Sequence, residues 1–201
     1  MGKIESALAA ISAGLADKTW CADGRYSLAD IAVGCALGKA VYRETKRATV
    51  IVNFHTRREQ IPARAVAVLS PWFPDLDLAD VGMRTRCRLP PNRFDTTGSI
   101  YAMTFGTTIY WRDEFDPDDA VDLVKLAHEL VHVDQVRRLG GESSFACAYG
   151  TGYLNGGGEL PPYLARLTAY HRNPLEAEAY RFESHFRDDR GRVLPGRLTA
   201  T

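Results

Sequence analysis

The fold of this chain is decided by residues 116–139, which read DPDDAVDLVKLAHELVHVDQVRRL. Asp116 can cap a helix, Pro117 suits its first turn, and Gly140 follows its last helical residue. At about 100° per residue, one face of this helix gathers apolar side chains and the opposite face carries two histidines. The apolar residues are Leu123, Leu126, Leu130 and Val133. Since valines accompany the histidines, we expect a central helix that is covered on both sides.

The two histidines, His128 and His132, predict a metal site. Imidazoles four residues apart on a helix point the same way and can reach one ion at about 2.0–2.1 Å. Glu129 lies beside the pair and can take a proton from water that the metal activates, which is the work of a general base. The spacing therefore predicts a zinc peptidase with Glu129 as its catalytic residue. The alternative is two hydrogen-bonded histidines in a buried helix, with Glu129 in solvent.

A zinc site also needs a third protein ligand, and residues 173–180 offer one. Asn173 and Pro174 predict the start of another helix, because the first can cap it and the second fits its first turn. Glu176 is the favoured ligand and Glu178 the alternative. Glu176 also occupies the third helical position, where an acid often serves as a capping-box residue instead. The possibility that neither glutamate binds metal stays open.

Three segments in order resemble one known family. Residues 104–110 (TFGTTIY), 126–135 (LAHELVHVDQ) and 173–180 (NPLEAEAY) are similar to the metallopeptidase domain associated with extracellular contractile injection systems, over about residues 70–185. The resemblance implies a zincin-like fold of the glutamate-ligand (gluzincin-like) type. In that type the third ligand stands four residues before an acid that orients a histidine. Counting back from Tyr180 gives Glu176, but a tyrosine here replaces the acid, so support for the histidine is weaker or comes from elsewhere.

The first 46 residues resemble a different family. Residues 20–32 (WCADGRYSLADIA) are similar to the C-terminal helical domain of glutathione S-transferases. Helices are expected over residues 4–15 and from Ser27, whose hydroxyl can cap the second one. In that family a thioredoxin-like domain holds most of the glutathione, and this chain has none, so no glutathione-binding residue is carried over.

The remaining pattern predicts an α+β fold. A helix is expected over residues 57–69, and strands over 81–89, 100–105 and 108–111, the last two joined by Gly106-Thr107. We expect a small antiparallel sheet, the central histidine helix and a glutamate-bearing helix, with an N-terminal helical appendage. The expected domains are 1–47 (transferase-like fragment), 48–187 (zincin-like domain) and 188–201 (loosely ordered tail). Residues 107–111 are the strand along which a peptide substrate would pair, unless they form an ordinary core strand.

The composition of the chain limits the classes of partner that we expect. Lys and Arg number 25 and Asp and Glu also 25, so no net charge indicates nucleic acid or acidic lipid. We expect a peptide or protein substrate and, because no leader or membrane-spanning segment is apparent, a cytoplasmic protein. The four cysteines are widely spaced, which predicts free thiols.

Five residues between the ligand helices are candidates to stabilise an oxyanion, none of them favoured: Tyr149, Tyr153, Tyr163, Tyr170 and His171. Two other functions are considered, a non-catalytic metal-binding or scaffold module and, less favoured, a glutathione-transferase-like protein.

Overall fold

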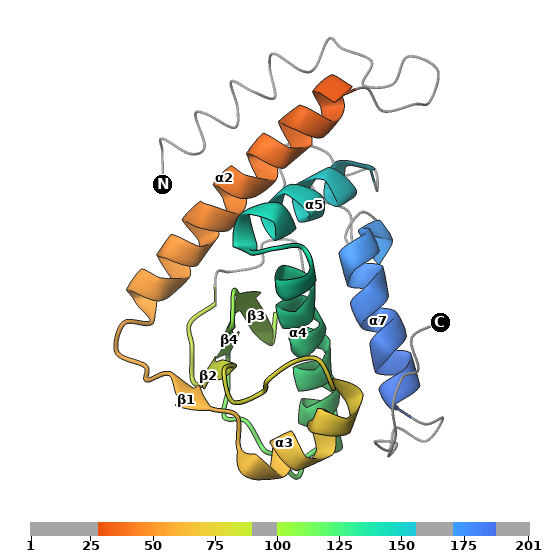
Figure 1. Ribbon diagram of the computed structural model, residues 1–201. Helices are drawn as coiled ribbons and strands as arrows, with labels where there is room; N and C mark the ends of the chain where they lie inside the picture. The colour runs from red at the N-terminus through yellow and green to blue at the C-terminus, as the bar shows by residue number, and fades with distance from the viewer. Residues whose placement is uncertain (1–27, 90–99, 156–170, 188–201) are drawn as a thin grey trace.

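The computed structural model of this protein describes residues 28–89, 100–155 and 171–187 (Figure 1). The helix predicted over residues 4–15, most of the transferase-like stretch and the tail 188–201 lie outside these ranges. The described chain is a mixture of helices and one small sheet, so the α+β prediction is confirmed. None of its helices is long and apolar enough to cross a membrane.

The sheet has four short strands, β1 (Glu59–Gln60), β2 (Gly82–Arg84), β3 (Ala102–Phe105) and β4 (Thr108–Trp111), in the order β1-β2-β4-β3. β3 and β4 form the expected antiparallel hairpin, in which Gly106 adopts a φ of 62°. β4 enters between β3 and β2 and runs parallel to β2, so the sheet is mixed, whereas an antiparallel one was predicted. Both edges of β4 are therefore paired. Among the described strands the sheet edges belong to β1 and β3, so β4 is not the free edge strand that the sequence predicted for the substrate.

The helix α3 (Ala63–Leu69) and a 3-10 turn, η2 (Ser70–Trp72), follow β1. The helix predicted over residues 57–69 begins only at Ala63, because Pro62 has no N–H and disfavours helical geometry at the residue before it. The part of that segment before Pro62 pairs as β1 instead.

The central helix is α4 (Ala120–Arg138), which lies between the sheet and α7 (Pro174–Phe186) in Figure 1. Its cap is Asp119, whose side chain accepts a hydrogen bond from the Val121 N–H at 2.8 Å, and not Asp116. The predicted apolar face is buried against the sheet and α3, and the opposite face is buried too. α7 begins as predicted, with Asn173 as cap and Pro174 in the first turn.

A long helix, α2 (Leu28–Val52), packs on α5 (Glu142–Asn155). The domain boundary predicted after residue 47 falls inside α2. The helices meet at Gly38 and Gly150, and a Cβ on Gly38 would lie 2.1 Å from the Ala146 carbonyl oxygen. The small residues of α2 thus permit this close packing.

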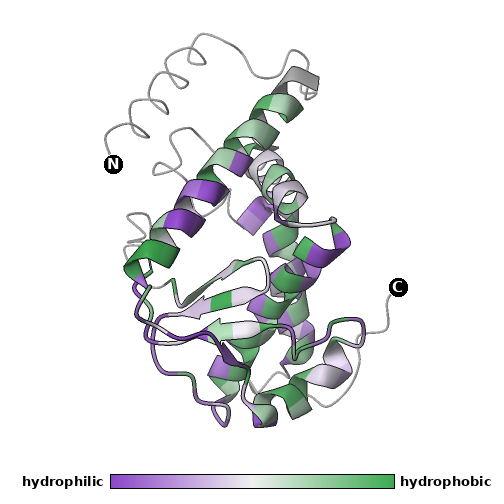
Figure 2. Cartoon of the chain, turned by 60° about the vertical axis from the view of Figure 1, so that its left-hand side comes forward, coloured by the Kyte–Doolittle hydropathy of each residue, from purple (hydrophilic) through white to green (hydrophobic). Residues whose placement is uncertain are grey.

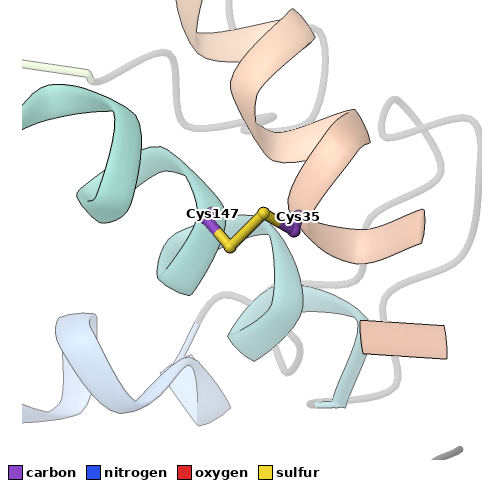
Figure 3. Close-up of a disulfide and its surroundings, with 2 residues drawn as sticks. All are labelled: Cys35 and Cys147. Carbon is purple, nitrogen blue, oxygen red and sulfur yellow. A yellow bond between two sulfur atoms is a disulfide. The ribbon is translucent and has the colours of Figure 1, made fainter. Parts of the chain in front are cut away.

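A disulfide joins Cys35 of α2 to Cys147 of α5 (Figure 3). The prediction of free thiols was wrong for these two residues and is confirmed for Cys87, which is free and buried. The pair is separated by 112 residues, so the sequence carries no local sign that these thiols meet.

Candidate metal centre

Three side chains from two helices converge on one point. His128 and His132 of α4 are 8% and 7% exposed, and Glu176 of α7 is 2% exposed. The two Nε2 atoms are 3.1 Å apart; Glu176 Oε2 is 3.3 Å from His128 Nε2, and Glu176 Oε1 is 3.6 Å from His132 Nε2. Ligands at about 2.0–2.1 Å from a tetrahedral zinc ion are about 3.3–3.4 Å from one another. The three residues therefore have ligand atoms at the spacing of a metal-ligand set, as the burial and proximity of the cluster also indicate.

The two oxygens of Glu176 have different surroundings. Oε1 accepts a hydrogen bond from the Tyr149 hydroxyl at 2.6 Å, whereas Oε2 is buried, faces His128 Nε2 at 3.3 Å and forms no hydrogen bond of good geometry. A buried carboxylate oxygen without a well-formed hydrogen bond is costly, and an adjacent cation, a metal ion or a protonated imidazole, removes that cost. This oxygen therefore fits a cation better than it fits the capping role that the sequence left open for Glu176.

Gln135 fixes the orientation of His132. The Gln135 amide nitrogen donates to the Leu175 carbonyl oxygen and to Glu178 Oε2, both at 2.9 Å. With its nitrogen so engaged, Gln135 presents Oε1 to His132 Nδ1 at 2.9 Å, so Nδ1 is the atom that donates. The lone pair of His132 Nε2 then points toward the centre. Glu178, the alternative ligand, is a support for Gln135 and lies outside the ligand cluster.

Glu183 takes the corresponding position at His128. Glu183 Oε1 is 3.5 Å from His128 Nδ1, and the Tyr180 ring packs on the same imidazole with 5.0 Å between ring centroids. Tyr180 stands where the resemblance placed an orienting acid, and the carboxylate comes from one turn further along α7. Residues four and seven positions after Glu176 share its helical face, so this periodicity was the sequence signal for Glu183. Sequence reasoning missed it.

The charges of the centre depend on one another. Burial lowers the pKa of His128, but hydrogen bonds to Glu176 and Glu183 and the charge of Glu129 outweigh it and raise this pKa to about 10. Burial likewise opposes the rise in the pKa of His132, which Glu176 causes. Burial raises the pKa of Glu176, but the two histidines outweigh it and lower this pKa below its ordinary value. Without a metal, the cluster therefore retains a proton at neutral pH.

Glu129 lies beside the cluster and outside the ligand set. Its carboxylate accepts a hydrogen bond from the Thr104 hydroxyl of β3 at 2.6 Å, and its charge raises the pKa of both histidines. It is half-buried. An edge strand of the sheet, β3, thus contacts the residue that the sequence predicts as the general base.

The oxyanion candidates separate into groups. Tyr149 is bound to Glu176, and burial raises its pKa well above the ordinary value. His171 packs on Tyr180, with 5.1 Å between ring centroids. Tyr163 and Tyr170 lie outside the described residues. Tyr149 is therefore a candidate whose hydroxyl contacts the His128, His132 and Glu176 cluster.

Part of the chain matches a known protein family. Residues 60–140 match the eCIS core domain. The match links the chain to extracellular contractile injection systems and runs from β1 through the end of α4, so it includes both histidines and Glu129. Glu176 and α7 lie beyond it. No curated protein and no solved structure matches the chain.

Proposed function

We propose that this chain is a zinc-dependent peptidase whose metal is held by His128, His132 and Glu176. The observation that carries the proposal is the convergence of the ligand atoms of these three buried residues on one another. Two histidines and a glutamate, with a further glutamate beside them, are the residue types of helix-borne hydrolytic zinc sites. The eCIS core match supports a link to extracellular contractile injection systems, and the peptidase activity is our proposal from the residues.

Each residue of the centre has a role in this proposal. A zinc ion, when bound, supplies a Lewis acid that acidifies water and polarises a carbonyl group. Glu129 accepts the proton of the attacking water and delivers it to the leaving amine. Thr104 holds the Glu129 carboxylate from β3, and Gln135 and Glu183 hold the imidazoles so that their Nε2 atoms face the centre.

The free edge of β3 is where we propose that the peptide substrate binds. An extended peptide can add to an exposed edge strand through main-chain hydrogen bonds. Thr104 lies on β3 and contacts Glu129, so a peptide paired there would pass beside the proposed general base. β4, in contrast, has no free edge to offer.

The test joins metal analysis to a cleavage assay. Purified protein is expected to contain nearly one zinc per chain, rather than iron or manganese, and His128→Ala is expected to lose it. Glu129→Gln should keep the zinc and lose cleavage of a diverse peptide library by about 100-fold or more. Glu59→Gln, the same change at an exposed glutamate of β1, is the matched control and should alter neither. Cleavage that persists in Glu129→Gln would refute the proposed role of Glu129.

A non-catalytic metal-binding module is the second candidate. The observation that favours it is the burial of all three ligand residues, because a catalytic zinc keeps one position open to water or substrate. Full zinc occupancy with no cleavage of any library peptide would decide for this candidate.

A further inference from the structure

The C-terminal end of α2 carries an exposed apolar surface, which we call the α2 tip. It consists of Val50 (44% exposed), Ile51 (58%), Val52 (47%) and Phe54 (83%). In Figure 2 this end of the helix is green and lies at the left-hand edge of the molecule, beyond a purple stretch of α2. A contiguous cluster of large, exposed apolar side chains is typical of an interaction surface. Such clusters are rare elsewhere on the surfaces of proteins.

The α2 tip is held rigidly in this form by Asn53. That side chain is 1% exposed, donates to the carbonyl oxygens of Thr49 (2.9 Å) and Arg88 (2.8 Å), and accepts from the Arg88 N–H at 2.7 Å. With Asn53 fixed inward, its neighbours Val52 and Phe54 face outward. The apolar residues therefore flank a position that hydrogen bonds to the Arg88 backbone hold in place.

Three arginines lie next to the α2 tip, two along the chain and one through backbone hydrogen bonds. Arg47 lies one helical turn before Ile51, Arg57 follows Phe54 by three residues, and Arg88 is bonded through its backbone to Asn53. All three are exposed, and none forms an ion pair with another described residue. Neither residues 47–57 nor residues 85–89 contain an acid. The zero net charge of the whole chain thus conceals a local surplus of positive charge.

We propose that the α2 tip docks on an anionic lipid bilayer. Its apolar side chains would enter the boundary between headgroups and acyl chains, and its arginines would meet the lipid phosphates. The charges argue against a symmetric contact with a second copy, because that contact would bring like arginines together. Nucleic acid would satisfy the arginines but not the aliphatic residues, which do not stack on bases. A bilayer satisfies both at once.

The test is co-sedimentation of the full chain with vesicles of phosphatidylcholine, either pure or with about a third phosphatidylserine. At about 0.1 M salt the protein should bind the phosphatidylserine vesicles, and about 1 M salt should weaken this binding. Each surface arginine contributes about fivefold, so the triple change Arg47→Ala, Arg57→Ala, Arg88→Ala should weaken binding by roughly 100-fold.

A matched pair of variants tests the apolar part. Val52→Asp should weaken vesicle binding by about tenfold or more, whereas Val121→Asp, at a valine of similar exposure (52%) near the start of α4, should not. Phe54→Asp should act as Val52→Asp does. All of these variants should keep their metal content, which separates this proposal from the metal centre.

Three results would overturn lipid docking. The first is no binding of the wild type to phosphatidylserine vesicles at low salt. The second is equal loss in Val52→Asp and Val121→Asp. The third is a dimer in solution that Phe54→Asp dissociates while vesicle binding is absent, which would assign the α2 tip to a second copy.

Discussion

Zinc binding should be strongly dependent on pH, because the zinc-free protein holds a proton on His128. The pKa of this imidazole is raised to about 10, so the group is protonated at neutral pH, and zinc must displace that proton to reach Nε2. At any pH below about 10, the displacement of one proton makes the apparent dissociation constant for zinc fall about tenfold for each unit by which the pH rises. From about pH 6 to about pH 8 the affinity should therefore rise about 100-fold. A histidine with the ordinary pKa of about 6.5 would give only about fourfold.

The other two ligand residues determine whether more than one proton is released. The pKa of His132 is also raised, so a second proton can only steepen the dependence. The pKa of Glu176 is lowered, so its carboxylate is ionised throughout this range and contributes no proton. The expected release is consequently at least one proton per zinc.

Competition against a chromogenic chelator of known pH dependence measures the affinity. Calorimetry in two buffers of different ionisation enthalpy counts the protons. Glu183→Gln removes one of the groups that raise the pKa of His128, so the pH at which the affinity stops rising should be lower, while Glu59→Gln should behave as the wild type. An affinity that changes only about fourfold over the same range would contradict the raised pKa of His128, because an ordinary histidine gives that change.

Three further substitutions test other parts of the structure. Gln135→Ala removes the acceptor that orients the second ligand histidine, so zinc affinity should fall by about 10- to 100-fold in the chelator assay. Thr104→Ala should leave the zinc content unchanged and lower the cleavage rate by about tenfold, since Glu129 loses its 2.6 Å hydrogen bond. Cys147→Ala opens a disulfide that spans 112 residues, so the free energy of unfolding in urea should fall by about 4–5 kcal/mol in the chain-entropy model. A reductant should destabilise the wild type and Cys87→Ala similarly and leave Cys147→Ala unaffected; no effect of reductant on the wild type would contradict the disulfide.

The sequence predicted the parts of the centre that depend on local geometry. His128 and His132 are four residues apart on one helix, so their proximity follows from helical periodicity alone. The Asn173 cap placed the start of α7, and with it the position of Glu176 on the helix. The proximity of Glu176 to the histidines came from a family resemblance and the need for a third ligand, and the structure bears it out.

The sequence could not predict the contacts that arise from docking between elements. Gln135 and Glu183 are ordinary polar residues on their own helices, and only the packing of α7 against α4 brings them to the imidazoles. The Cys35–Cys147 pair depends in the same way on the crossing of α2 and α5. The position of β4 inside the sheet depends on its pairing with β2, for which a three-residue strand gives almost no pattern.

The ligand geometry and the docking of α7 depend on the same side chains. Gln135 orients His132 with one atom of its amide and binds the Leu175 carbonyl of α7 with the other. Glu178 accepts a hydrogen bond from the same amide nitrogen and also forms an ion pair with Arg138 of α4. Since these bonds exist only when α7 is docked, a metal ion that binds all three ligands must stabilise the docked helix, and undocking must release the ion. The His-Glu-x-x-His motif thus provides two ligands locally, and the affinity of the complete site reports the tertiary packing of α7.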